Sequence, residues 1–236
     1  MRFWILKQLI PTLFPQTCLL CGEPGDFDSR FCHACYRELP FNLHACPRCA
    51  LPLPPGTSSG TLCGHCLKRS SPLDTSVTAL RYEAPTKRLI SALKFHQQLH
   101  LSAPLARLLI ARLGILDAPP DRIIPVPLHA LRLKERGFNQ AVELGRILSR
   151  HYAIPLDLHC VQRVRNTQAQ SDLKETARQK NLRKAFLIRR PVKGLKLAIL
   201  DDVITTGATV RELGRTLKQA GAKQVDVWAI ARTVRH

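Results

Sequence analysis

The sequence predicts an α/β protein in which a parallel sheet flanked by helices follows a small cysteine-rich region. Two observations predict this class. After residue 75, short apolar segments alternate with helical patterns, the order found where helices join the strands of a parallel sheet. Before residue 75, eight cysteines occur as four C-x-x-C pairs, a spacing typical of structural zinc sites.

The chain of 236 residues is expected to divide into three parts. Residues 1–16 mix bulky apolar with polar residues and predict an amphipathic helix, which packs on the body or touches a partner or a membrane surface. Residues 17–75 form the zinc-binding region, and residues 76–236 form the α/β domain. The first segment is too short to span a bilayer and no small-residue cleavage site follows it. We therefore expect a cytoplasmic protein, with the periphery of the inner membrane as an alternative location.

Positive charge dominates the α/β domain. The chain has 36 Lys and Arg against 17 Asp and Glu, a formal net charge of +19, whereas residues 1–75 hold only seven basic and five acidic residues. Such an excess favours a polyanionic partner, with nucleic acid ahead of anionic lipid and phosphorylated small molecules. A basic surface that only confers solubility is the alternative.

The paired cysteines predict two zinc sites with four thiolates each. The eight ligands are Cys18, Cys21, Cys32, Cys35, Cys46, Cys49, Cys63 and Cys66. Sequential pairing of neighbouring C-x-x-C units is the simpler arrangement, and an interleaved one stays open. Disulfides fit less well, since no secretion signal precedes the cysteines. Closed shells of four thiolates leave no open coordination position, so both Zn²⁺ ions are expected to be structural.

The first half of the α/β domain reads as strand, helix, helix and strand. Residues 77–82 alternate like an edge strand, and residues 84–96 and 101–113 have helical periodicity. Lys94 stands where the first of these helices ends and is expected to reach an anion, with a solvated helix surface as the alternative. Residues 121–128 predict a short buried strand whose carboxyl end should lie at the ligand crevice of a parallel sheet.

A basic loop is expected at residues 132–140, before a helix over residues 141–151. Glycine freedom and basic side chains suit a lid over a pyrophosphate, with Lys134 or Arg136 bonding its oxygens. A turn with exposed charge is the alternative. Residues 154–158 read as a further strand.

The last part of the chain contains the densest basic stripe. Residues 163–171 lack periodicity and read as a loop, residues 173–183 predict a helix, residues 185–188 begin a strand, and residues 224–234 form the last strand. We expect the stripe on the predicted helix to contact single-stranded DNA. It contains Arg178, Lys180, Arg183 and Lys184.

The segment 197–209 carries the chemistry. Four apolar residues predict a buried strand, Asp201 and Asp202 follow at its carboxyl end, and a loop rich in Thr and Gly leads to a helix over residues 210–220. The loop consists of Thr205, Thr206, Gly207, Ala208 and Thr209. Hydroxyls and N–H groups at a helix N-terminus suit a phosphate, and the two acids then need sugar hydroxyls or Mg²⁺ between them and the ligand. The alternative is an ordinary turn in which Thr209 caps the helix.

At every position this string resembles the phosphoribosyl pyrophosphate signature of type I phosphoribosyltransferases. Two further motifs are Arg136-Gly137-Phe138-Asn139-Gln140 and Asn166-Thr167-Gln168. With the two four-cysteine units, they make the chain similar to the ComF/GntX family over nearly its full length. The resemblance implies a type I phosphoribosyltransferase-like, Rossmann-like domain behind a double zinc ribbon. It also implies a role in DNA uptake during natural transformation or in DNA utilisation.

The same resemblance implies roles for individual residues. Asp201 and Asp202 would contact the ribose hydroxyls of phosphoribosyl pyrophosphate, directly or through Mg²⁺. Residues 205–209 would hold its monophosphate, and residues 136–140 would lie over its pyrophosphate.

Three functions are compatible with the sequence. The first is a phosphoribosyl-pyrophosphate-binding factor for DNA uptake or utilisation that binds single-stranded DNA. The second is an active phosphoribosyltransferase on an unidentified acceptor, although no residue is an obvious base for that acceptor. The third is a zinc-ribbon adaptor to DNA-uptake machinery at the inner membrane, with the later domain as a non-catalytic scaffold.

Overall fold

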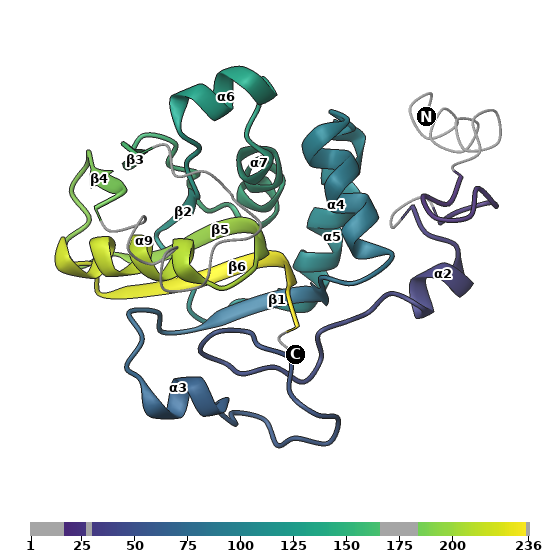
Figure 1. Cartoon of the computed structure of the whole chain (residues 1–236), viewed down its shortest axis with the longest axis horizontal. Coiled ribbons are helices and arrows are strands. Elements are labelled where there is room, and N and C mark those ends of the chain that lie inside the picture. Colours follow the sequence, from purple (N-terminus) through teal and green to yellow (C-terminus); the bar gives the residue numbers. More distant parts are fainter. Residues whose placement is uncertain (1–16, 27–29, 166–183, 235–236) are drawn as a thin grey trace, which may run out of the picture.

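The computed structural model of the protein describes residues 17–26, 30–165 and 184–234. Within these residues four strands form a parallel sheet in the order β1, β6, β5, β2 (Figure 1). The strands are β1 (Ser76–Arg81), β2 (Arg122–Pro125), β5 (Lys196–Ile204) and β6 (Gln224–Arg232). The central pair, β5 and β6, is buried almost throughout, which explains why both strands read as long apolar runs.

Helices cover both faces of the sheet, and each face has its own core. The covering helices are α4 (Thr86–Phe95), α5 (Ser102–Leu113), α7 (Gln140–Tyr152) and α9 (Ala208–Gln219). Because side chains alternate along a strand, Ala198 and Leu200 of β5 belong to the core with α4, α5 and α7, whereas Leu197 and Ile199 belong to the core with α9. A small antiparallel sheet extends the α9 side. It consists of β3 (Val161–Arg163) and β4 (Phe186–Ile188).

Most elements of the α/β domain lie where the sequence predicts them. Strand β1 is at the edge of the sheet, α4 and α5 occupy the two predicted helical segments, and β6 is the last long strand. A short 3₁₀ turn, η1 (Leu99–Leu101), leads into α5. The predicted helix over residues 173–183 lies outside the described residues.

The segment predicted as a basic loop is largely helical instead. Helix α6 (Ala130–Arg136) begins where His129 Nδ1 accepts a hydrogen bond from the N–H of Leu131 at 3.3 Å. It ends at Gly137, whose φ of 79° lies in the left-handed region and stops the helix. The prediction was wrong because charge suggested a loop, although Leu, Lys, Glu and Arg are good helix formers.

Residues 154–158 do not form the predicted strand. They make an isolated parallel bridge between Ile123 and Leu156, in which the N–H of Ile123 donates to the carbonyl of Pro155 at 2.8 Å. Proline has no N–H to donate, so the ladder does not extend through Pro155.

Strand β5, in contrast, is longer than predicted. It continues to Ile204 and therefore contains Asp201 and Asp202, which were expected after its end. The extension follows from the tertiary structure, because β6 pairs with β5 as far as Arg232. The two acids are thus held by a sheet and not by a loop.

The zinc-binding region contacts the domain in two places. Its first unit contains α2 (His33–Arg37) and packs against the core around α5 through Phe31 and Tyr36 (Figure 1). Its second unit contains α3 (Gly64–Lys68) and lies beyond β1. Within the described residues, no helix has both the length and the apolar character needed to cross a membrane.

Candidate functional site

Two clusters of four cysteine sulfur atoms form, each from two neighbouring C-x-x-C pairs. The ligand atoms of Cys18, Cys21, Cys32 and Cys35 lie within 4.8 Å of one another, as do those of Cys46, Cys49, Cys63 and Cys66. The Sγ atoms of Cys21 and Cys32 are 3.7 Å apart, and those of Cys49 and Cys63 are 3.6 Å apart. Tetrahedral thiolates at a Zn–S distance of about 2.3 Å are about 3.8 Å from one another, so both clusters fit Zn²⁺. The sequential pairing is the one formed, and the two zinc sites are structural.

A buried ion pair lies near the carboxyl end of β5. Asp202 is 2% exposed, and Lys94 from the last turn of α4 pairs with its Oδ2 atom. Gln140, the first residue of α7, donates from Nε2 to Asp202 Oδ1 at 3.0 Å. Burial opposes the ionisation of Asp202, but Lys94 and then Gln140 outweigh it and lower the pKa of this carboxyl. Three elements far apart in the sequence therefore meet at one carboxylate.

Asp201 directly precedes Asp202 on β5, and its carboxyl group lies close enough to interact with the Asp202 carboxylate. It is half-buried, and its Oδ1 atom accepts a hydrogen bond from the N–H of Asp202 at 2.9 Å. Loss of water and the neighbouring Asp202 carboxylate raise the pKa of Asp201, while Lys94 opposes that rise. A ligand hydroxyl that donates to Asp201 would stabilise its charged form.

A cationic pocket of about 480 Å³ opens beside the ion pair. It is lined by Lys94, Phe95, Gln97, Arg132, Glu135 and Arg136. Arg136 donates from Nη1 to Gln140 Oε1 at 2.7 Å, and its guanidinium lies 5.4 Å from the centre of the Phe95 ring. Burial and then the nearby charge of Arg132 depress the pKa of Arg136, although Asp202 opposes this. An anion in the pocket would relieve the repulsion between these guanidinium groups.

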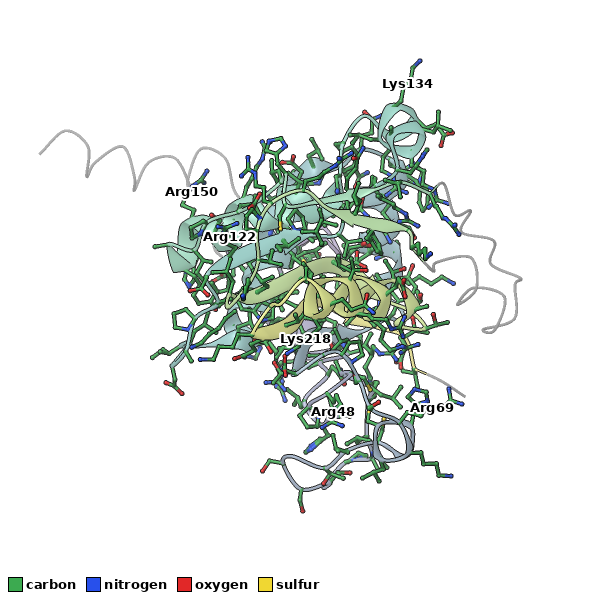
Figure 2. The ribbon with its side chains drawn as sticks, turned by 90° about the vertical axis from the view of Figure 1, so that its left-hand side faces the viewer. Arg48, Arg69, Arg122, Lys134, Arg150 and Lys218 are labelled. Carbon is green, nitrogen blue, oxygen red and sulfur yellow. The ribbon has the colours of Figure 1, made fainter. Side chains whose placement is uncertain are left out.

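The two basic residues predicted to bond a pyrophosphate are placed differently. Arg136 lines the pocket and is half-buried, whereas Lys134 is exposed and points away from the body of the protein (Figure 2). Arg132, to which the sequence pattern assigned no role, lies in the pocket instead. Arg132 lies one turn before Arg136 on α6. Had the segment been interpreted as a helix, the two arginines would have been predicted on the same helix face.

The loop after β5 ends at a glycine that begins α9. Gly207 has a φ of 76° and is the N-cap residue, so Thr209 lies within the first turn of the helix and does not cap it. Thr206 Oγ1 accepts a hydrogen bond from the N–H of Ala208 at 3.3 Å. Thr205 is exposed, while Thr206 and Thr209 are half-buried. The loop thus lies at a helix N-terminus directly after the acid pair, a position at which N–H groups and hydroxyls can bind an anion.

The segment after β2 lies at the same edge of the sheet. The N–H of Val126 donates to the carbonyl of Leu200 at 2.8 Å, which continues the pairing of β2 with β5. Asn139 then donates from Nδ2 to the carbonyl of Val126 at 3.0 Å and caps α7 through its Oδ1 atom. The segment after β2 thus lies beside the carboxyl half of β5, as the parallel arrangement predicted, and Asn139 joins it to the start of α7.

Known families match both parts of the chain. A double zinc ribbon domain matches residues 9–73, and a phosphoribosyl transferase domain matches residues 135–233. The DNA utilization protein YhgH of Shigella flexneri is 38% identical over 230 residues, which cover 93% of this chain and 98% of that protein. Competence protein F of Haemophilus influenzae is 38% identical over 180 residues, which cover 72% of this chain and 78% of that protein. The chain belongs to the ComF family.

The chain is also similar to a third bacterial protein and to solved phosphoribosyltransferase structures. Competence protein ComFC of Bacillus subtilis is 27% identical over 218 residues, 87% of this chain and 85% of that protein. Among solved structures, adenine phosphoribosyltransferase from Leishmania donovani is 14% identical with a TM-score of 0.36, covering 57% of this chain and 53% of that chain. The two family matches give the ComF-family chain the predicted architecture, a double zinc ribbon before a phosphoribosyltransferase-like domain.

The predicted DNA-binding stripe of this ComF-family protein is only partly described. Lys184 is exposed, and its N–H donates to Glu212 Oε1 at 3.0 Å. Arg178, Lys180 and Arg183 lie outside the described residues. The basic residues labelled in Figure 2 are spread from the second zinc unit to the tip of α6. Within the described residues, their placement singles out no groove for DNA.

Proposed function

We propose that this ComF-family protein binds phosphoribosyl pyrophosphate, or a closely related ribose phosphate, as part of a role in DNA utilisation. The names of its relatives and the matching phosphoribosyl transferase domain support the two halves of this proposal. The observation that carries it is the pairing of Lys94 with Asp202, which joins the acid pair to the cationic pocket. The cationic pocket then lies on one side of Asp201 and Asp202, and the loop of residues 205–209 follows them on the other.

This order of charges matches the ligand. The N–H groups and hydroxyls of residues 205–209 suit the monophosphate, and Asp201 suits the ribose hydroxyls, which can donate hydrogen bonds to it. Arg132 and Arg136 suit the pyrophosphate, because a guanidinium group can bind two of its oxygens at once, and the ammonium of Lys94 adds a further positive charge. A ligand with negative charge at both ends and hydroxyls between them uses all three parts.

Mg²⁺ fits the acid pair poorly. Both oxygens of Asp202 already have donors, from Lys94 and Gln140, so the ammonium of Lys94 stands where a divalent cation would bind this carboxylate. We propose that Mg²⁺ enters with the pyrophosphate and is held by its oxygens, because Mg²⁺ in phosphate sites binds few protein ligands. The carboxylate of Asp202 should then contribute little to holding Mg²⁺.

Transfer of the phosphoribosyl group would require more than binding of the ligand. Lys94 and Arg136, which line the cationic pocket, would stabilise a departing pyrophosphate, the electrostatic part of a transfer reaction. The acceptor's base is not assigned, and a ligand loop can persist after transfer has disappeared. Release of pyrophosphate on adding nucleobases would establish the enzyme, and a broad acceptor screen without release would leave a binding protein.

Arg136→Ala should weaken the binding of phosphoribosyl pyrophosphate roughly tenfold to a hundredfold, because the substitution removes one charge-assisted hydrogen-bonding group. Lys134→Ala is the matched control: it removes a neighbouring charge on the same helix, but that side chain points away from the pocket. Its affinity should stay within about twofold of the wild type, since an exposed charge contributes little. Calorimetry measures both, and equal effects of the two substitutions would contradict the assignment of Arg136.

Single-stranded DNA is the second proposed ligand, supported by the net charge of +19 and by the names of the relatives. Neutralising Lys180, Arg183 and Lys184 together should reduce the slope of log affinity against log salt by about 0.7 for each phosphate that the variant no longer neutralises. The control is a variant that neutralises three exposed arginines elsewhere: Arg69, Arg112 and Arg150. Equal slopes for the two triple variants would show that net charge, and not the stripe, binds DNA.

A further inference from the structure

The second zinc unit is attached to the phosphoribosyltransferase-like domain through four consecutive backbone carbonyls. Residues 47 to 50 begin inside its first C-x-x-C turn, and each of their carbonyls accepts a hydrogen bond. The N–H and Oγ of Ser76, at the start of β1, donate to Pro47 and Arg48 at 2.7 and 2.8 Å. Asn42, which is bonded to β1, donates from Nδ2 to Ala50 at 2.9 Å. The geometry of this turn is therefore coupled to the sheet.

The remaining carbonyl, that of Cys49, accepts a hydrogen bond from Arg232. This arginine is the last residue of β6 and is only 2% exposed. Its Nε atom donates to the carbonyl of Cys49 at 3.1 Å. Its Nη1 atom donates to the carbonyls of Ile204, at 3.0 Å, and Thr205. One planar guanidinium thus joins the zinc-ligand residue Cys49 to the end of β5 and to Thr205, the first residue of the loop 205–209, which we call the anion loop.

Holding these carbonyls also orients the loop. The carbonyl of Thr205 and the N–H of Thr206 belong to one planar, trans peptide unit, so fixing the direction of the oxygen fixes the opposite direction of the N–H group. The carbonyl of Ile204 is held in addition by the N–H of Thr233 at 3.0 Å. Arg232 therefore holds the carbonyl side of the Thr205–Thr206 peptide unit, the first unit of the loop whose N–H group would face a phosphate.

We propose that Arg232 is a positioning residue through which the second zinc site sets the conformation, and hence the anion affinity, of residues 205–209. The cluster of Cys46, Cys49, Cys63 and Cys66 fits Zn²⁺, and the metal would fix the turn whose Cys49 carbonyl holds Arg232. Loss of that metal frees the turn and releases the guanidinium from one of its anchors. The proposal rests on the proposed function only for the identity of the anion.

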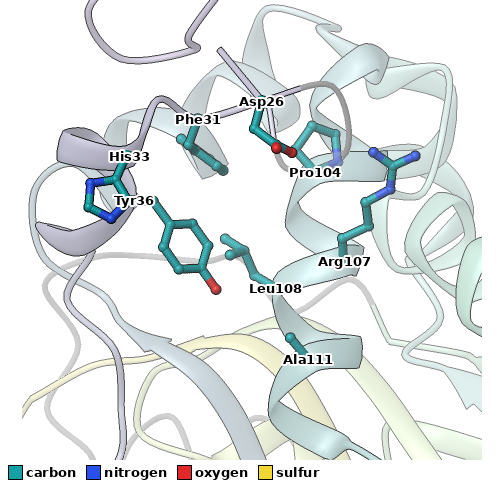
Figure 3. A pocket seen from close by; sticks show the side chains of 8 residues that line it. All are labelled: Asp26, Phe31, His33, Tyr36, Pro104, Arg107, Leu108 and Ala111. Atoms are coloured by element: carbon teal, nitrogen blue, oxygen red, sulfur yellow. The ribbon is translucent and has the colours of Figure 1, made fainter.

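The first zinc unit provides an internal control. It packs against α5, where Phe31 and Tyr36 line a cavity of about 400 Å³ (Figure 3). The other residues that line this cavity are Asp26, His33, Pro104, Arg107, Leu108 and Ala111. Neither the acid pair nor the anion loop contributes to it, so emptying the first metal site should leave the loop unchanged.

The test compares three variants of the full chain. They are Arg232→Gln, the second-site variant Cys63→Ser with Cys66→Ser, and the first-site variant Cys21→Ser with Cys35→Ser. Hydrogen exchange of the amides of residues 205–209 should become about tenfold faster in the first two and stay unchanged in the third, a coupling within the usual range. Exchange of residues 197–200 in the core of β5 reports whether each variant is folded.

Affinity for phosphoribosyl pyrophosphate is measured on the same samples. It should fall about tenfold in Arg232→Gln and in the second-site variant, and combining the two should add little, because both break one chain of hydrogen bonds. Unchanged exchange and affinity in these two variants would overturn the proposal. If exchange responds as expected but the wild type binds no ligand, the proposed function fails and the role of Arg232 stands.

The wild-type protein offers a measurement that needs no variant. Coupling between two sites is reciprocal, so a ligand on the anion loop must strengthen the hold on the second zinc ion by the same factor. Saturating phosphoribosyl pyrophosphate should raise the affinity for one of the two zinc equivalents about tenfold, as measured by equilibrium competition with a chromogenic chelator. If the bound ligand changes the affinity of neither zinc ion, the coupling is contradicted.

Discussion

Lys94→Met is expected to lower the free energy of unfolding by about 3–5 kcal/mol, because it leaves the buried carboxylate of Asp202 without its cation. The side chains of Lys94 and Asp202 are 20% and 3% exposed, so solvent screens this pair only weakly. The same substitution should weaken the binding of phosphoribosyl pyrophosphate roughly a hundredfold, since it also removes a cation from the pocket. Urea unfolding and calorimetry measure the two effects.

A double variant separates these effects. Lys94→Met combined with Asp202→Asn leaves no unpaired charge, so most of the stability should return. The affinity should stay low, because both the cation and the carboxylate are gone. Recovery of the affinity together with the stability would mean that the ion pair only supports the fold.

The pH dependence of Lys94→Met has a defined sign. In the wild type, Lys94 lowers the pKa of Asp202, so the pair contributes stability above the unfolded pKa of Asp, about 3.9, and this contribution is lost as the pH falls through the folded pKa. In the variant, the unpaired buried carboxyl is easier to protonate than in the wild type. The difference in unfolding free energy should therefore be largest near neutral pH and shrink as the pH falls toward about 4.

Gly207→Ala should weaken ligand binding at least tenfold, because the anion loop depends on its φ of 76°. A Cβ atom there would also lie 2.8 Å from Arg211 Nη1, so that side chain must move. Gly194→Ala is the matched control: its φ is 78°, and a Cβ atom would meet nothing within 4 Å. Both substitutions should cost about 1–2 kcal/mol of stability through the left-handed backbone. An equal loss of affinity in both would point to general destabilisation.

Local sequence patterns predicted much of the molecule. The C-x-x-C spacing identified all eight zinc ligands, since two thiolates two residues apart can reach one ion without help from the rest of the chain. Alternation predicted β1, and the apolar run at residues 197–200 predicted a buried strand, because both faces of β5 are covered. The string from Asp201 to Thr209 indicated the phosphoribosyltransferase-like domain for the same reason, because the motif is contained in one short segment.

Errors arose where a local pattern had two interpretations. The basic residues of α6 suit either a loop or an exposed helix face, and the cap at His129 that decides between them is a weak signal. The end of β5 was predicted too early because acids rarely lie inside strands. They do so here since β6 continues alongside and Lys94 neutralises Asp202.

The sequence by itself determined the eight cysteines of the two zinc sites and the buried strand that leads to the two acids, because each is specified by neighbours along the chain. Only the tertiary structure decided that Lys94 and Gln140 meet at Asp202, and that Arg232 joins Cys49 to the anion loop. The physical reason is that such contacts depend on how helices cross a sheet and which strand ends coincide. Periodicity and residue type, read along the chain, leave these undetermined.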